Sequence, residues 1–598
     1  MVNTKRLRSE SFYNFHENND RKRFLSSTTN DNFTQFENLA NELIYDIFDY
    51  LDFYHIYTSF FNLNFRFRSL LIDSTLPLKI NLFLMSKITF NQYNEDIIKP
   101  NQQRIDIFRV TNYYMFDKNT FLFSQMISLQ TLILETVRSV QMKDIIQQLI
   151  SLPNLSSLTI STINAVENID FIYKQIFRLT SLRYCKLSLS RKFPKHVSPL
   201  TLNEYSPIEH LNIDHGIGFD ELSTLLLYLP QLRHLSTHIW HKTDFILKPP
   251  CAVLNNLTHV SLKLYGCVTF NDLELFLVNY CTSIQFLCIS GDKEFLNANR
   301  WKRLISLSLT NLQTFDIECE IRFADNTAIK QEMKNFNSLF WIERQWFFEC
   351  RAYSTKFYDE ILFYSMNPFR RKKYRLSQGK SNKNRFQTIL NSVHHVTIED
   401  NNEINENTYC FPYATILTLA SKVSINDITI VNNLQRILSL KQIQILEILS
   451  DHLCPLKMSE LLSYMPNVHT LTFRSMSFDG YGKKLFEQNP LFRLISKINL
   501  IKSIHFYGKC TLQNLEIFLK LFPNLQYIET SVELQQIQLV LQYLLNKTNT
   551  NARHLRLLCF SCDGKESHYI SKLIKSRLLP CDCKTIFDDQ HLRLYIWW

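Results

Sequence analysis

Apolar residues recur along this chain in a six-residue pattern that fills the first, fourth and sixth places. The copies are LQTLIL from Leu129, LSSLTI from Leu155, LRYCKL from Leu182, IEHLNI from Ile208, LRHLST from Leu232, LTHVSL from Leu257 and IQFLCI from Ile284, with a weaker first copy, IDIFRV, from Ile105. From Leu129 onward they begin 24 to 27 residues apart, and segments of helical periodicity such as ELSTLLLYLP (221–230) fill the intervals. The pattern therefore predicts that each repeat unit contains one short strand followed by one helix.

Neither element of such a unit buries its apolar face alone, so neighbouring units are expected to stack into a solenoid with parallel strands inside. The fold class is then α/β. The period and the strand pattern resemble the leucine-rich repeat family in its longer, helical variety. One departure is that the Asn or Cys that usually follows the strand at a fixed offset is not regular here.

The pattern is lost after about residue 320 and returns near VHHVTI (393–398). Further copies follow as IQILEI (443–448), VHTLTF (468–473), LQYIET (525–530) and LRLLCF (555–560). Two arrays, 76–320 and 391–598, are thus expected, separated by an insertion at 321–390. Its aromatic part, WIERQWFFECRAY (341–353), predicts buried packing, and its basic part predicts an exposed loop.

A different apolar segment, NELIYDIFDYL (41–51), precedes the repeats. As a helix it gathers its large apolar side chains on one side, and eleven residues are too few to hold a helix alone. The longer stretch 39–71 resembles an F-box, the helical motif by which substrate receptors dock onto the adaptor of a cullin-RING ubiquitin ligase. The matching positions are Leu39, Glu42-Leu43, Ile47-Phe48, Tyr50-Leu51, Leu63, Arg66-Phe67 and Leu70.

Two positions depart from that motif: the usual Leu-Pro start is Leu39-Ala40, and Phe67 stands where Trp is common. The resemblance implies a three-helix F-box at 34–75, behind a disordered basic tail at 1–33. It also implies an adaptor-binding face made of Leu39, Leu43, Ile44, Ile47, Phe48, Leu51, Leu63 and Phe67. The alternative is a helical cap that closes the end of the solenoid, because repeat arrays need capping units.

The net charge of +11 is concentrated in two segments. Residues 1–23 carry six basic and three acidic side chains, and residues 370–385 carry eight basic and no acidic ones, which together account for the whole excess. This distribution favours solvated charge over a folded basic face, so nucleic acid is not the expected partner. A nucleic-acid site at 370–385, with stacking on the preceding aromatics, is the alternative, and the tail loosely resembles a bipartite nuclear-import signal.

Composition agrees with a globular intracellular protein of the cytoplasm, the nucleus or both. Of 598 residues 45% are hydrophobic and 20% charged, no apolar run is long enough to span a membrane, and the 14 Cys are scattered in apolar stretches as in reduced proteins. Cys559, Cys562, Cys581 and Cys583 have spacings that would also permit a structural zinc site. A buried thiol in the strand at Cys559 is the simpler interpretation, so no metal and no cofactor is expected.

No catalytic residue is predicted, because the chain has only nine Gly and shows neither a P-loop nor a dinucleotide-binding pattern. The candidate binding residues are those expected to point away from the core on successive strands. They are Tyr184, Lys186, His210, Asn212, His234, Ser236, His238, His259 and Lys263. We hypothesise that His210, His234 and His259 form a ladder that contacts an acidic or phosphorylated partner, more strongly as pH falls toward the histidine pKa. A merely polar exposed strip is the alternative.

An F-box followed by leucine-rich repeats is a known pairing, and it implies a substrate receptor of an SCF-type ubiquitin ligase. Such a protein binds the adaptor through its first helices and an unknown protein substrate through its repeats, and is not itself an enzyme. The alternative is a leucine-rich-repeat scaffold that binds proteins outside any ligase.

Overall fold

The protein is described from a computed structural model and divides into two compact units, 1–71 and 72–598. The structure describes residues 36–72, 77–82, 85–112, 120–191, 205–241, 254–266, 268–322, 326–354, 359–367, 369–376, 388–406, 409–425, 429–450, 453–476, 488–546, 549–561, 568–570, 572–573, 583–588 and 592–597. The predicted basic tail (1–33) lies outside these residues.

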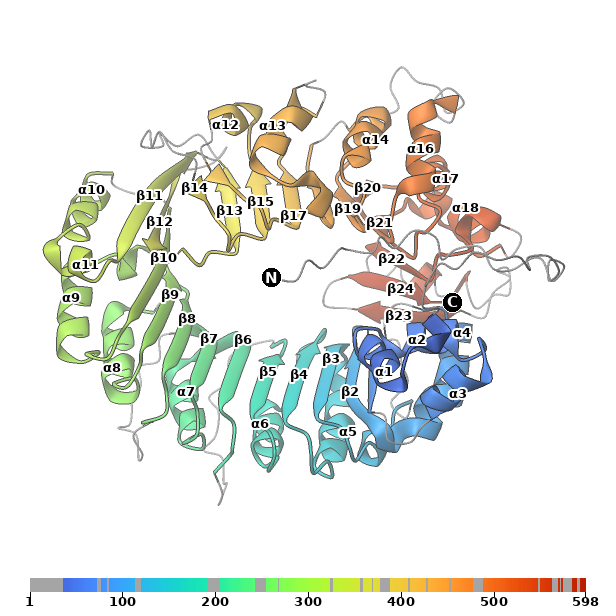
Figure 1. Cartoon of the computed structure of the whole chain (residues 1–598). Helices are drawn as coiled ribbons and strands as arrows, with labels where there is room; N and C mark the ends of the chain where they lie inside the picture. Colours follow the sequence, from blue (N-terminus) through green and yellow to red (C-terminus); the bar gives the residue numbers. More distant parts are fainter. Residues whose placement is uncertain are drawn as a thin grey trace. The chain divides into compact units, whose positions relative to one another are not determined.

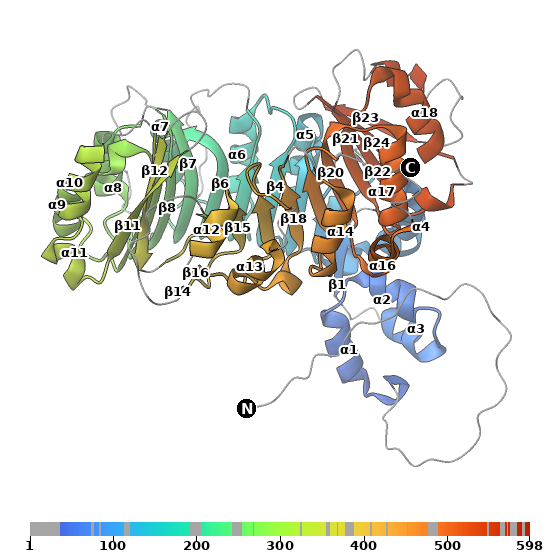
Figure 2. The ribbon, with the colours of Figure 1, turned by 90° about the horizontal axis from the view of Figure 1, so that it is seen from above.

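The first unit contains three short helices, which Figure 2 shows as one group: α1 (Asn41–Asp49), α2 (Phe53–Phe60) and α3 (Phe65–Ile72). Asp52 caps α2 by accepting a hydrogen bond from Tyr54 N at 2.9 Å. The ring of Phe60 lies 5.3 to 5.6 Å from the rings of Phe36, Phe48 and Phe67. These aromatic contacts form the centre of the unit.

Arg66 joins the two ends of this unit. Its guanidinium donates to the carbonyl oxygens of Glu37 and Leu39 and, at 2.6 and 3.1 Å, to the side-chain oxygen of Asn41. The segment that precedes α1 is thereby fixed to α3 by charge-assisted hydrogen bonds.

The second unit begins with a twelve-stranded sheet (Figure 1). In spatial order its strands are β1 (Leu78–Leu82), β2 (Ile105–Val110), β3 (Thr131–Val137), β4 (Ser157–Thr162), β5 (Tyr184–Ser188), β6 (His210–Gly218), β7 (His234–His241), β8 (His259–Leu264), β9 (Phe286–Gly291), β10 (Thr314–Arg322), β12 (Asp359–Asn367) and β11 (Phe347–Ser354). All pairs from β1 to β10 are parallel, whereas β12 pairs antiparallel with both β10 and β11.

Helices cover one face of this sheet and leave the other, which we call the open face, to the strands (Figure 1). They are α4 (Lys87–Tyr93), α5 (Ser139–Leu149), α6 (Ile169–Phe177), α7 (Phe219–Leu226), α8 (Phe270–Tyr280), α9 (Ala298–Leu307), α10 (Asn326–Asn335) and α11 (Leu339–Glu343). The fourth places of the repeated pattern meet in register as a buried row: Leu132, Leu158, Cys185, Leu211, Leu235, Val260 and Leu287. Apolar burial between strand and helix therefore sets the repeat.

A second, ten-stranded sheet follows. In spatial order it contains β13 (Lys373–Leu376), β15 (His395–Ile398), β17 (Ile416–Leu419), β18 (Ile445–Ile448), β19 (Thr470–Phe473), β20 (Ser503–Lys509), β21 (Tyr527–Ser531), β22 (Leu557–Ser561), β24 (Arg593–Trp597) and β23 (Lys584–Asp588). Its helices are α12 (Asn401–Glu406), α13 (Ile430–Ile437), α14 (Pro455–Ser463), α16 (Pro490–Ile498), α17 (Leu512–Leu521) and α18 (Leu534–Leu544), and β14 (Thr388–Ile389) pairs with β16 (Tyr409–Cys410). The strands from β13 to β22 pair in parallel. β24 pairs antiparallel with both β22 and β23.

These sheets confirm a mixed α/β fold with long runs of parallel strands, and the strands β3 to β9 coincide with the predicted copies. Among the parallel strands of these two sheets, the sequence pattern did not reveal β1, β10, β13, β17 or β20. Among the described residues, no helix is both long and apolar enough to cross a membrane.

The start of the basic run is not the exposed loop that we expected. Arg371 donates to Glu318 at 2.8 Å, and Arg375, on β13, donates to Glu399 at 2.6 Å. Between them the Tyr374 side chain is buried. Because the basic residues alternate with apolar ones here, the segment adds a strand to the second sheet, while residues 377–387 lie outside the described part.

The last strand of the second unit contacts the first repeat of the same unit. Trp597, on β24, donates a hydrogen bond from its indole Nε1 to the carbonyl oxygen of Met85 at 2.8 Å. Its ring lies 6.0 Å from that of Phe90 on α4, and only 4% of the Trp597 side chain is exposed. The end of β24 therefore covers the start of the first array.

Candidate functional site: a row of stacked rings

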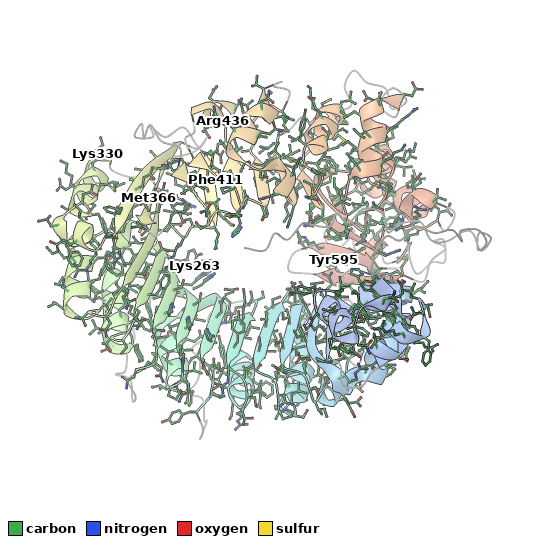
Figure 3. All side chains as sticks on the ribbon, in the orientation of Figure 1. Lys263, Lys330, Met366, Phe411, Arg436 and Tyr595 are labelled. Carbon is green, nitrogen blue, oxygen red and sulfur yellow. The ribbon has the colours of Figure 1, made fainter. Side chains whose placement is uncertain are left out.

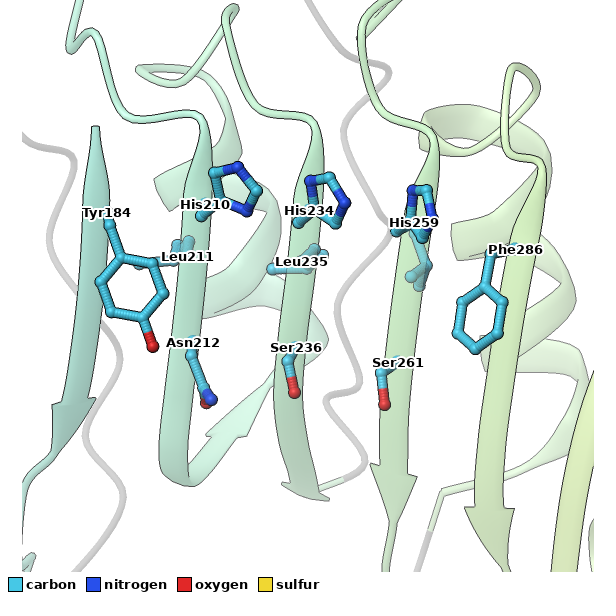
Figure 4. Close-up of a pocket in the computed structure, with 11 residues that line it drawn as sticks. Tyr184, His210, Leu211, Asn212, His234, Leu235, Ser236, His259, Ser261 and Phe286 are labelled. Atoms are coloured by element: carbon cyan, nitrogen blue, oxygen red, sulfur yellow. The ribbon is translucent and has the colours of Figure 1, made fainter. Parts of the chain in front are cut away.

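The strip of residues predicted from the sequence lies on the open face of the first sheet. His210 is the register partner of Tyr184 on one side and of His234 on the other, and His259 follows on β8. Phe286, on β9, extends the series. Figure 4 shows these five rings side by side across β5 to β9, and we call them the ring row.

The rings of this row stack on one another. The His210 and His234 centroids are 4.1 Å apart with an interplanar angle of 15°, and those of His234 and His259 are 4.2 Å apart at 22°. His259 and Phe286 follow at 5.5 Å and 25°, whereas Tyr184 is tilted against His210 at 6.4 Å. Parallel strands in register lie about 4.8 Å apart, so equal side chains at equal heights meet face to face.

A second row of small polar side chains follows two residues further along the strands: Asn212, Ser236 and Ser261 (Figure 4). Together the two rows line an open hollow of about 260 Å³, with the buried residues Leu211, Leu235 and Val260 beneath. The hollow crosses the strands and is lined by the rings on one side and by the small polar side chains on the other. Such a surface can hold a chain segment by ring contacts and hydrogen bonds.

Two histidines of the ring row, His234 and His259, have lowered pKa values. Burial, together with the neighbouring His210, His259 and Arg233, lowers the pKa of His234 from 6.5 to about 4. The pKa of His259 is also lowered, by burial and by Arg370. The pH dependence expected near the ordinary histidine pKa is therefore displaced to lower pH for these two rings, and near neutral pH they offer uncharged N–H donors.

The remaining predicted residues lie next to the ring row and not in its hollow. Lys186 forms an ion pair with Asp214 at 2.8 Å, and this hydrogen bond raises the Lys186 pKa against the opposing effect of burial. His238 and Lys263 are register partners further along β7 and β8. Burial and the charge of Lys263 lower the His238 pKa.

Three members of this site were not predicted. Ser261 occupies the fifth place of LTHVSL. Phe286 occupies the third place of IQFLCI, so the repeat pattern itself was a sufficient signal for it. Arg370 has no such signal, because it lies in the basic run 84 residues after Phe286. Its guanidinium stands 4.5 Å from the Phe286 ring centroid, a cation–π contact that ends the row.

An acidic group lies beyond this end. Asp316, on β10, is the register partner of Cys288, and the thiol of Cys288 lies 3.8 Å from its carboxylate. Burial and the nearby Glu318 raise the pKa of Asp316 to about 6, against the effect of Arg370. Asp316 is therefore costly to ionise in the folded protein.

The predicted adaptor-binding residues fall into three groups, which differ in exposure. Ile44, Phe48 and Phe67 are buried within the three-helix unit, and Leu39 and Ile47 are partly buried. The exposed members are Leu43, Leu51 and Leu63, whose exposed fractions are 50%, 37% and 52%. Tyr50 and Phe65, which were not predicted as binding residues, are also exposed.

The cysteine cluster considered for zinc is only partly described. Cys559 is buried in β22, and burial raises its pKa to about 12, while Cys583 is partly buried. Cys562 and Cys581 lie outside the described residues. Within the described part of the chain, no group of three or more His, Cys, Asp or Glu side chains is arranged to hold a metal ion.

Comparison of the chain with models of known protein families gives no match, and comparison with curated proteins gives no significant match.

Proposed function

We propose that the protein is the substrate receptor of a cullin-RING ubiquitin ligase, with the three-helix unit as its F-box and the repeats as its substrate-binding part. The observation that carries the proposal is that α1 to α3 form a compact unit that leaves Leu43, Leu51 and Leu63 exposed. Because residues 39–71 resemble an F-box, we infer that those leucines bind the adaptor subunit.

The exposed leucines supply a reason for association. Full burial of a leucine side chain is worth about 1.5–3 kcal/mol, so covering three half-exposed leucines contributes about 3 kcal/mol. Ile44, Phe48 and Phe67 hold the helices together and in this way position the exposed residues. Arg66 fixes the entry to α1 by its contacts to Glu37, Leu39 and Asn41.

The alternative function for these helices, a cap on the solenoid, has less support. The first repeat is already covered by residues of its own unit, since α4 follows β1 and Trp597 contacts Met85 and Phe90. A scaffold that binds proteins outside any ligase remains the second candidate, and the experiment below separates the two.

In this proposal the chain itself makes and breaks no covalent bond. It holds a target protein close to ubiquitin carried by the ligase, which raises the effective concentration of the reacting groups. The open face, with its ring row, is the surface proposed to hold the target. The protein then acts inside the cell, in the cytoplasm, the nucleus or both.

The test is assembly of the full-length chain with a purified F-box adaptor and cullin, followed by size-exclusion chromatography. We expect one complex that contains all three proteins. A folded chain that elutes apart from the adaptor would favour the scaffold function.

A further inference from the structure

Three cations lie near the ring row, each close to a different strand. Arg233 precedes His234 on β7, Lys263 belongs to β8, and Arg370 stands over Phe286 on β9. Each lowers the pKa of a different histidine: Arg233 that of His234, Lys263 that of His238 and Arg370 that of His259. Three cations therefore lie beside the rings of β7 to β9.

Two of these cations have no ion pair among the described residues. Arg183 and Arg233 share Glu209, and Lys186 is paired with Asp214. Lys263 and Arg370 have no ion-pair partner among the described residues, although Asp316 opposes the charge of Arg370. Glu318, two residues after Asp316 on β10, is itself paired with Arg371. Among the described residues Lys263 and Arg370 are thus left without an ion pair, and Arg233 shares a single carboxylate with Arg183.

Figure 3 shows Lys263 on the strand side of the unit, and Lys330, on α10, on the helix side. Lys263 is exposed, and so is Arg370. Both cations can therefore meet a bound chain without rearrangement of the core.

We propose that the ring row and its surrounding cations bind an acidic segment of a partner protein, in extended conformation across β6 to β9. The inference rests on the proposed function, because it names the class of segment that the receptor selects. His234 and His259 donate ring N–H groups to carboxylates, and Arg233, Lys263 and Arg370 supply the charge.

The spacing of the cations favours carboxylates over one phosphate group. A phosphate dianion is best bound by a cluster of cations that reach it together. Here the cations are spread over three strands, about 10 Å from β7 to β9. Every second side chain of an extended segment lies about 7 Å from the next, so a series of Asp or Glu residues matches this spread better.

The experiment is fluorescence anisotropy of labelled peptides with the full-length chain at low ionic strength. The peptides alternate Ser with Glu, Ser with Gln, or Ser with phosphoserine. We expect the Glu peptide to bind at least about tenfold more tightly than the Gln peptide, and added salt to weaken it. Equal binding of the Glu and Gln peptides, or no binding of the Glu peptide, overturns the proposal. A phosphoserine peptide that binds more than about tenfold tighter than the Glu peptide also overturns it, in favour of a phosphate site.

Charge-reversal variants test whether the Glu peptide binds at the ring row. Lys263→Glu with Arg370→Glu should weaken the Glu peptide at least about tenfold. The matched control, Lys143→Glu with Lys330→Glu, makes the same change of net charge on α5 and α10 and should leave binding within about twofold. An equal loss in both double variants would overturn the proposal, because it would show a general effect of charge. Since Arg370 packs on Phe286, Lys263→Gln alone serves as a variant that removes only an exposed cation.

Adaptor binding is measured on the same preparations. Adaptor binding without Glu-peptide binding contradicts this inference and leaves the proposed function standing. Glu-peptide binding that depends on Lys263, without adaptor binding, supports the site and contradicts the ligase function.

Discussion

The indole Nε1 of Trp597 donates a hydrogen bond to the carbonyl oxygen of Met85, 2.8 Å away and 512 residues earlier in the chain. The same ring lies 6.0 Å from Phe90. A solenoid normally has two free ends, each of which must be covered. In this unit the last strand and the first repeat cover one another.

Trp597→Ala should therefore destabilise the second unit. Loss of a buried Trp side chain costs about 3–5 kcal/mol, whereas Trp597→Phe, which keeps a ring beside Phe90, should lose about 1 kcal/mol with the hydrogen bond. Urea unfolding measures both, and small-angle scattering should show a larger radius of gyration for Trp597→Ala. In a double-mutant cycle with Phe90→Ala the losses should be non-additive by about 1 kcal/mol. Additive losses with unchanged scattering would contradict the contact.

His215 should make stability fall in acid. Its ring is buried, with Nε2 2.8 Å from the Tyr173 hydroxyl, and Leu189 N–H donates to Nδ1 at 3.2 Å. Burial, assisted by the charge of Arg191, lowers its pKa from 6.5 to about 3. The unfolded chain therefore binds the proton first, so stability is intact above pH 6.5 and declines as pH falls toward 3.

At pH 5 this linkage should cost about 2 kcal/mol relative to pH 7. Urea midpoints measured across that range should decline more steeply for the wild type than for His215→Gln, which has no imidazole to protonate. Parallel pH profiles of the two proteins would show that His215 does not titrate as described.

Asp316 should make the stability of the folded protein depend on pH in the opposite direction. Its pKa is raised from 3.8 to about 6 by burial and Glu318, so its contribution to stability is present below pH 3.8 and is lost as pH rises through 6. Asp316→Asn should therefore stabilise the protein by about 2 kcal/mol at pH 7.5, and much less at pH 4. Thermal or urea unfolding at the two pH values checks this, and a destabilised variant at pH 7.5 would contradict it.

The repeated pattern was enough to predict where β3 to β9 lie and that three histidines align across them. Because the third place of each copy falls at the same height on neighbouring parallel strands, His210, His234 and His259 could be aligned from sequence alone. The lowered pKa values of His234 and His259 could not be predicted, since they depend on burial and, for His259, on Arg370, which comes from a distant segment. Trp597 likewise carries no local signal of its contact with Met85, because the two are separated by nearly the whole unit.

The helical pattern of 41–51 predicted an apolar face but not how that face is divided. Ile44 and Phe48 turn toward the other two helices, whereas Leu43 and Leu51 remain exposed. A periodicity of 3.6 residues places all four on one side and cannot separate packing within a three-helix unit from docking. The same limit applies to Phe67, which matches the motif and is fully buried.

The central claim is tested most directly by the affinity of the full-length chain for a purified F-box adaptor, measured by biolayer interferometry. The site variant is Leu43→Asp with Leu63→Asp. The control is Leu307→Asp with Leu539→Asp, which changes two exposed leucines on α9 and α18. We predict binding by the wild type and the control, and at least about a hundredfold loss in the site variant. Absence of binding by the folded wild type, or equal binding by all three proteins, would contradict the ligase function.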